Sequence, residues 1–125
     1  MIALDASALL AFLFRERGYK RVAEVVEYAC LSTVNLSEVL GRFTRDGHDS
    51  NEALTRIAAT TIEIVPFGAK DAAIAASLVP ITQPLGLSLG DRACIALALS
   101  RNLKAVTADR IWSKLNVGVN IEIIR

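Results

Sequence analysis

The stretch Ile2-Ala3-Leu4-Asp5-Ala6-Ser7-Ala8-Leu9-Leu10 passes from a short apolar run, through an acidic residue, into a second apolar run. We expect residues 2–4 to form a buried strand that ends at Asp5. Residues 7–15 are expected to form a helix, which Gly18 breaks. Short strands followed by helices recur along the chain, and this alternation predicts right-handed β-α-β crossovers and a mostly parallel sheet.

The rest of the chain continues this alternation. Further strands are predicted at residues 30–33, 62–65, 105–106 and 119–124. Further helices are predicted at residues 19–29, 34–46, 49–60, 69–79, 88–100 and 110–115. Residues 80–87 hold two prolines and a glycine, so we expect a loop there. The predicted fold class is α/β, a three-layer α/β/α sandwich with helices on both faces of the sheet.

Composition bounds the class of protein. The length of 125 residues fits a single domain over residues 1–125. Hydrophobic residues make up 53% and charged residues 22%, which excludes an intrinsically disordered chain. The net charge of +1 does not by itself indicate a nucleic-acid binder. If acids gather in one pocket, however, basic residues must dominate elsewhere, and a neutral total then hides a polarised surface.

No feature of the sequence indicates export or a membrane span. Met1 leads straight into Ile2 without the basic and long apolar regions of a signal peptide. The most apolar helix, around residues 93–99, is far shorter than the ~18–20 residues that cross a bilayer. Cys30 and Cys94 lie far apart among aliphatic residues and are expected to be buried free thiols. We therefore expect a soluble, cytoplasmic protein.

Four acids stand at places where the predicted topology brings elements together. Asp5 follows the first strand, Asp109 follows the strand at 105–106, and Glu38 lies in the first turns after the second strand. Asp91 is in the first turn of the apolar helix at 88–100. Ligands of open α/β sheets bind beyond the carboxyl ends of the strands, so we expect Asp5, Glu38 and Asp109 at one edge, which the start of the helix that carries Asp91 could face.

Helical geometry separates Glu38 from the core of its helix. At about 100° per residue, one stripe of this helix is apolar, and Glu38 points away from it. The stripe consists of Leu36, Val39, Leu40 and Phe43. Asp91 differs, because its helix is apolar nearly all round and the carboxylate is expected to be partly buried. Such a carboxylate needs a partner or a cation.

Each acid also has a purely structural interpretation. Asp5 and Asp109 are each followed by a predicted helix that they could cap. Ser88 and Asp91 fit a capping box, and Glu38 could pair with Arg42 one turn on.

Four converging carboxylates would repel one another unless cations neutralise them. Mg²⁺ or Mn²⁺ suits a site made only of carboxylate oxygens. Two such ions together could activate water and stabilise the leaving oxygen of a phosphodiester. Zinc is disfavoured, because His48 is the only histidine and the cysteines are scattered.

Four segments together resemble the PIN-domain family, and within it the VapC toxins of bacterial toxin–antitoxin pairs. The resemblance lies in the order, spacing and flanking residues of the four acids and covers essentially the whole chain. The segments are Leu4-Asp5-Ala6-Ser7-Ala8-Leu9-Leu10, Val34-Asn35-Leu36-Ser37-Glu38-Val39-Leu40, Leu87-Ser88-Leu89-Gly90-Asp91-Arg92-Ala93-Cys94-Ile95-Ala96-Leu97-Ala98 and Val106-Thr107-Ala108-Asp109-Arg110-Ile111-Trp112.

The resemblance implies a Mg²⁺-dependent endoribonuclease in which Asp5, Glu38 and Asp91 ligate metal and Asp109 supports the metals or their waters. It also implies that Thr107 helps to hold the cluster, and we expect Ser7 to orient Asp5 or a metal-bound water. The implied partners are an RNA substrate, a cognate antitoxin that inserts a basic side chain near the acids, and a second copy in a homodimer.

Basic and aromatic side chains near these motifs have two interpretations. Arg92 and Arg110 either line an RNA path, where phosphate contacts supply affinity, or form ordinary surface and ion pairs. For Arg42, Arg45 and Lys114 ordinary surface or pairing is favoured. Trp112 and Tyr28 could stack on bases, but packing in the core is favoured.

Other classes of function fit less well. A non-catalytic RNA- or protein-binding module of the same fold would be expected to lack some acids, and none is missing. A dehalogenase-type phosphatase needs D-x-D after the first strand, where this chain has Asp5-Ala6-Ser7. A receiver domain needs a phosphoacceptor Asp after the third strand, where Val65-Pro66-Phe67 stands. No nucleotide-binding glycine motif is present. A DNA nuclease with the same acids remains open.

Overall fold

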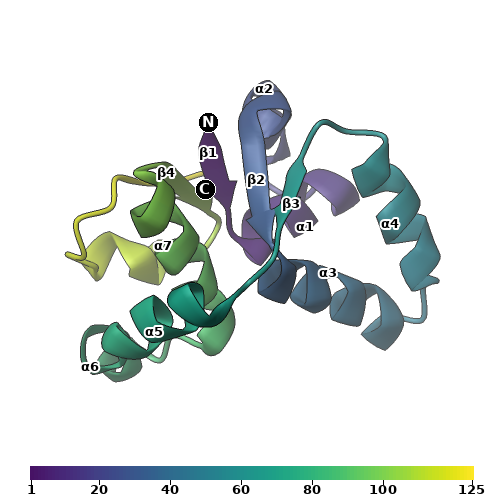
Figure 1. The fold of residues 1–125 in the computed structure, drawn as a ribbon. Coiled ribbons are helices and arrows are strands. Elements are labelled where there is room, and N and C mark those ends of the chain that lie inside the picture. Colours follow the sequence, from purple (N-terminus) through teal and green to yellow (C-terminus); the bar gives the residue numbers. More distant parts are fainter.

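A computed structural model describes residues 1–125 as a five-stranded, all-parallel sheet with helices on both faces (Figure 1). The strands are β1 (Ile2–Leu4), β2 (Ala29–Ser32), β3 (Glu63–Val65), β4 (Lys104–Thr107) and β5 (Ile121–Ile123). Their order across the sheet is β3-β2-β1-β4-β5. The predicted α/β sandwich is confirmed, and the sheet is parallel throughout.

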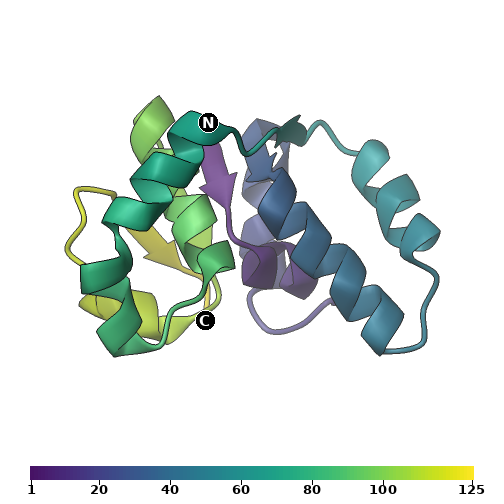
Figure 2. The same ribbon diagram turned by 60° about the horizontal axis from the view of Figure 1, so that its bottom comes forward.

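The helices divide between the two faces of the sheet. The α-helices are α1 (Ala6–Phe14), α2 (Tyr19–Val25), α3 (Thr33–Arg45), α4 (Ser50–Ala58), α5 (Ala69–Ser77), α6 (Val79–Thr82) and α7 (Leu89–Arg101). Short 3₁₀ helices are η1 (Val26–Tyr28), η2 (Gln83–Leu85) and η3 (Arg110–Lys114). Helices α1 to α4 lie on one side and α5 to α7 on the other (Figures 1 and 2). No helix is both long and apolar enough to cross a bilayer.

Alternation along the strands supplies one core to each face, because successive side chains of a strand point to opposite sides. Ile2 and Leu4 pack with α1 to α4, whereas Ala3 packs with α7 and Trp112 on the other face. Both cysteines are buried in this second core as free thiols, as predicted. The two cores hold β1 firmly in the middle of the sheet, so the residue that follows it, Asp5, is fixed in place.

Several predicted boundaries differ from the structure. The helix predicted at 19–29 ends at Val25, a 3₁₀ turn follows, and Ala29 belongs to β2, where it pairs with Ile2. The loop predicted at 80–87 is instead α6 followed by η2. Each begins with a proline in its first turn, where the missing N–H would have no partner anyway. Gly86, with φ +73°, then ends η2 in the left-handed conformation.

Candidate metal-binding site

The carboxyl ends of the strands are turned toward the viewer in Figure 2. The residue that directly follows β1, Asp5, is one of those that line a pocket of about 480 Å³. All four acids singled out in the sequence line it: Asp5, Glu38, Asp91 and Asp109. They come from the end of β1, from α3, from α7 and from the turn after β4. The remaining lining residues are Ala6, Ser7, Leu10, Gly41, Arg42 and Arg45. The structure thus brings the four acids together from four separate elements.

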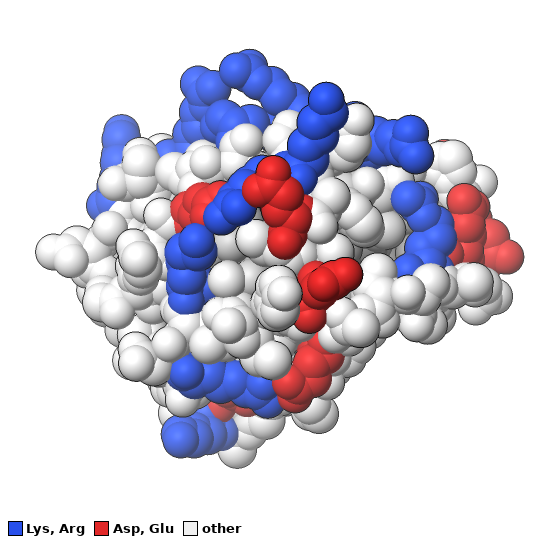
Figure 3. All heavy atoms as spheres, turned by 90° about the horizontal axis from the view of Figure 1, so that it is seen from above, with Lys and Arg blue, Asp and Glu red and all other residues white.

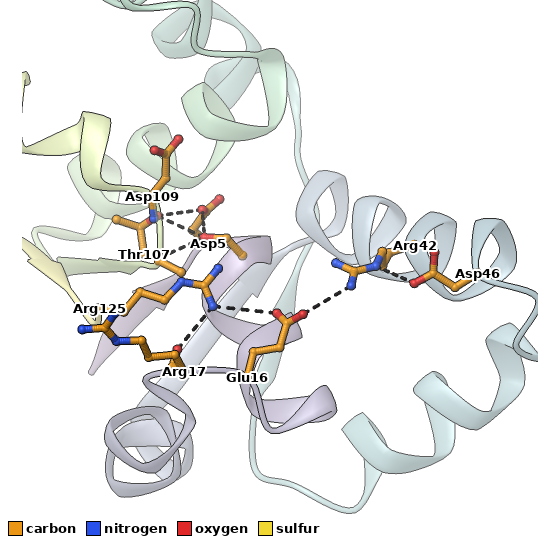
Figure 4. A network of polar contacts seen from close by, with 10 residues as sticks. Asp5, Glu16, Arg17, Arg42, Asp46, Thr107, Asp109 and Arg125 are labelled. Atoms are coloured by element: carbon orange, nitrogen blue, oxygen red, sulfur yellow. Dashed lines mark hydrogen bonds and ion pairs between the residues drawn. The ribbon is translucent and has the colours of Figure 1, made fainter.

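Asp5 is the most deeply buried of the four, with 3% of its surface exposed. It stands at the N-cap position of α1, but its side chain accepts no capping hydrogen bond, so the capping interpretation is wrong. Its Oδ2 atom instead accepts hydrogen bonds from Ser7 Oγ at 2.6 Å and Thr107 Oγ1 at 2.9 Å. Figure 4 shows Asp5 and Thr107 below Asp109 in this arrangement. The Oδ1 atom has no hydrogen bond and is not among the buried unpaired atoms, so it remains accessible.

The pKa of Asp5 is raised from 3.8 to about 7, and burial is the largest cause. The nearby carboxylates of Asp91 and Glu38 contribute to this rise, and the two hydroxyl hydrogen bonds oppose it. The fold therefore keeps a carboxylate where ionisation is unfavourable and where no basic side chain offsets it. A cation in the pocket would supply the missing charge.

Glu38 reaches the pocket from a largely exposed position on α3, as the helical wheel predicts. It does not pair with Arg42; its Oε2 accepts a hydrogen bond from Asn35 Nδ2 at 3.0 Å. The carboxylate end lies against Gly90 of α7. Burial of that end raises its pKa, the Asn35 hydrogen bond lowers it, and Asp91 raises it.

Asp91 is half-buried, as expected, and closes the predicted capping box with Ser88 at the start of α7. Its Oδ2 accepts from the Ser88 backbone N–H at 2.7 Å and from Ser88 Oγ at 3.0 Å. Asp109 likewise caps η3, because its Oδ1 accepts from the Ile111 N–H at 3.0 Å. Both carboxylates therefore have a structural role as well as a place in the pocket.

No three of these acids already converge closely enough to form a metal-binding cluster. The donor set nevertheless fits a hard divalent cation, because it consists of carboxylate oxygens alone. None of the four carboxylates forms an ion pair, although five other acids do: Glu16, Glu24, Asp46, Glu63 and Glu122. The pocket therefore gathers four carboxylates without a basic partner around one cavity.

The surface at the amino end of β1, on the far side of the molecule from the pocket, is shown in Figure 3. Basic and acidic side chains lie side by side there. There Arg21 and Lys104 both pair with Glu122, and Arg101 pairs with Glu63. The pKa of Glu122 falls to about 2, with the Arg21 hydrogen bond as the largest cause. Glu63 and Glu122 thus each have a basic partner, unlike the acids of the pocket.

Arg42 and Arg45, which the sequence assigned to ordinary surface or pairing, line the pocket. Arg42 is held by Asp46 at 2.6 Å and Glu16 at 3.3 Å, and its guanidinium lies over the Phe14 ring. Figure 4 shows Glu16 between Arg42 and Arg125. The pairing is therefore real, but its partners are not the pocket acids.

The residues proposed for RNA contact lie outside the pocket lining. Arg92 donates to the Leu87 carbonyl at 3.1 Å, and Arg110 donates to the Arg125 carbonyl at 3.0 Å. Trp112 is fully buried, as favoured, whereas Tyr28 is exposed and the prediction that it packs in the core is wrong. Sequence reasoning missed Asn35, a fully buried amide between α3 and α7.

Comparison with known proteins agrees with this fold. The sequence profile described as the PIN domain matches residues 2–118. A toxin–antitoxin complex from Klebsiella pneumoniae contains a similar chain, with TM-score 0.72 and 17% identity over 97% of this chain and 100% of that one. A chain of VapBC2 from Rickettsia felis, bound to a promoter DNA fragment, is similar with TM-score 0.72 and 19% identity over 98% of each chain. VapC20 from Mycobacterium tuberculosis, a sarcin–ricin loop cleaving toxin, is similar with TM-score 0.74 and 18% identity. The match covers 96% of this chain and 99% of that one. No curated protein sequence matches.

Proposed function

The chain belongs to the PIN-domain family, and from this premise we propose that it is a divalent-metal-dependent endoribonuclease and the toxin of a type II toxin–antitoxin pair. The proposal takes residues 1–125 as one PIN domain, Mg²⁺ or Mn²⁺ as the cofactor and RNA as the substrate. A cognate antitoxin and a second copy in a homodimer are the proposed protein partners. Toxin–antitoxin complexes among the structural relatives support the antitoxin.

The observation that carries this proposal is the set of four unpaired carboxylates around one pocket. We assign Asp5, Glu38 and Asp91 as metal ligands and Asp109 as a supporting acid. When bound, a divalent cation supplies Lewis acidity, which activates water and stabilises charge on a phosphodiester. Ser7 and Thr107 hold Oδ2 of Asp5 and leave its Oδ1 for a cation.

One observation favours a second candidate, a non-catalytic RNA- or protein-binding module. Asp91 and Asp109 are engaged in helix caps, so the carboxylates do not form a ready-made cluster. The buried charge of Asp5 argues against that module, since an acid with a pKa of about 7 and no basic partner destabilises a fold that has no use for it.

The test is cleavage of an RNA pool that includes tRNA and ribosomal RNA, with Mg²⁺ or with EDTA. We expect discrete cuts that need metal and that fall roughly 100-fold or more in Asp5→Asn and Asp91→Asn, the scale of losing transition-state charge stabilisation. Asp49→Asn is the matched control, because Asp49 caps α4 outside the pocket and Asn caps equally well.

Absence of cleavage by folded, metal-loaded wild type would favour the binding module. Equal cleavage of matched single-stranded DNA would replace the ribonuclease assignment with a general nuclease.

A further inference from the structure

Asn35 occupies a core position on α3, although it is polar. It is fully buried and lies one and two turns before the buried Val39 and Phe43, on the same face of the helix. An amide at such a position needs hydrogen-bond partners to offset the loss of water.

The partners of Asn35 lie on two elements that carry pocket acids. Its Nδ2 donates to Glu38 Oε2 at 3.0 Å and to the backbone oxygen of Gly90 at 2.9 Å. Because both neighbours are acceptors, they fix which end of the amide faces them. Its Oδ1 has no partner, so this amide carries a cost that an apolar side chain would avoid.

Gly90 completes the contact from the side of α7. A Cβ atom built on Gly90 would overlap the carboxylate of Glu38. Glycine weakens a helix, yet here its missing side chain makes room for that carboxylate. The next residue is Asp91, so the contact between Glu38 and Gly90 also sets where two pocket acids stand relative to each other.

We propose that Asn35 is a positioning residue, which holds the Glu38 carboxylate against Gly90 and thereby fixes the spacing of Glu38 and Asp91 for one divalent cation. The inference rests on the metal site of the proposed function. It adds that the α3–α7 contact, and not only the acids, determines metal affinity. In other metal sites, removing the hydrogen-bond partner of a metal ligand lowers the affinity for the metal, which is in line with this role.

Asn35→Leu tests the proposal, because leucine keeps the size but removes both the donor and the unpaired oxygen. The Gly90 oxygen lies in the first turn of α7, where the N–H four residues further on remains its backbone partner. We expect the thermal midpoint to stay equal or rise, and Mn²⁺ affinity, measured by electron paramagnetic resonance of free Mn²⁺, to fall about tenfold. Ser37→Ala is the control, because this exposed hydroxyl on α3 has no hydrogen bond to Glu38.

Gly90→Ala tests the other half of the contact. We expect weaker Mn²⁺ binding and, in a crystal structure, a Glu38 carboxylate displaced from its position beside α7. Gly41→Ala controls for the gain in helix propensity and hence for stability alone, since Gly41 lines the pocket but an added Cβ there meets nothing within 4 Å. Its thermal midpoint should rise.

The outcomes separate this inference from the proposed function. If wild type and both variants bind Mn²⁺ equally, Asn35 and Gly90 are packing residues and the inference is overturned. If wild type binds no Mn²⁺, the metal-dependent function fails as well. Weaker binding in both variants, with Ser37→Ala unchanged, supports the inference.

Discussion

The Asp5 carboxylate is stabilised by hydrogen bonds and at the same time destabilised by burial and by neighbouring acids. Its Oδ2 is held by two hydroxyls, yet burial and neighbouring acids raise its pKa to about 7. Because the folded-state pKa lies above the unfolded value of 3.8, the folded chain binds more protons between pH 4 and 7. Metal-free stability therefore falls as pH rises through that window.

We predict that Asp5→Asn is more stable than wild type at pH 8 in EDTA and that the difference disappears near pH 4. A pKa difference of about 3 corresponds to roughly 4 kcal/mol as an upper scale. Asparagine can still accept from both hydroxyls, so the comparison isolates the charge. Thermal unfolding over a pH series measures it. A constant difference across the series would contradict the prediction, and saturating Mg²⁺ should reverse its sign at pH 8.

Individual residues show where sequence reasoning was sufficient. The order of the four acids, and the turn of Glu38 away from its apolar stripe, follow from strand ends and helical periodicity. Asn35 could not be found that way, because a periodic pattern marks its position as core and says nothing about the acceptors that α7 brings to it. The ion pair between Arg42 and Glu16 could not be predicted either, because the turn between α1 and α2 brings Glu16 to α3 only in the folded chain.

At the level of elements, α7 begins with a capping box whose acid is also a proposed metal ligand. Ser88 Oγ accepts from the Asp91 N–H at 3.4 Å and donates to Asp91 Oδ2 at 3.0 Å. The cap holds Oδ2 of Asp91, and because the four acids do not yet converge on one point, we expect the carboxylate to turn partly out of the cap when it ligates a cation. Helix stability and metal affinity therefore oppose each other at this residue.

We predict that Ser88→Ala destabilises the metal-free protein by about 1 kcal/mol, the usual scale of a lost cap, and strengthens Mn²⁺ binding severalfold because Asp91 is freer to turn. Chemical unfolding in EDTA and Mn²⁺ titration measure the two effects. Asp49→Ala, at the distant cap of α4, should lose similar stability without any gain in affinity. If Ser88→Ala loses both stability and Mn²⁺ affinity, helix stability and metal affinity do not oppose each other at Asp91.

Element boundaries were the weaker part of the sequence prediction, for physical reasons. Residues 26–29 continue an apolar stripe, but pairing of Ala29 with Ile2 converts the end of that run into strand. Residues 80–87 contain breakers, yet Pro80 and Pro84 sit in first turns, where proline is tolerated. Propensity alone cannot anticipate either outcome, because each depends on sheet pairing or on position within a turn.

For the whole molecule, the arrangement of charge matters more than its sum. A net charge of +1 conceals unpaired acids at one edge of the sheet and mutually paired charges on the opposite face. RNA approaching four carboxylates is repelled unless cations and basic side chains intervene. Arg45 is the pocket-lining base best suited to do so. Its side chain is 73% exposed, and its one ion pair, with Asp46, is long at 3.8 Å.

We predict that Arg45→Ala weakens RNA binding and lowers the slope of log affinity against log salt by about 0.7, the loss of one phosphate contact on a single strand. Binding is measured in the Asp5→Asn background, so that cleavage does not interfere. Lys20→Ala, an exposed charge on α2, is the control and should leave the slope unchanged. If both variants change the slope equally, RNA follows general surface charge, and the pocket edge formed by α3 does not guide the strand.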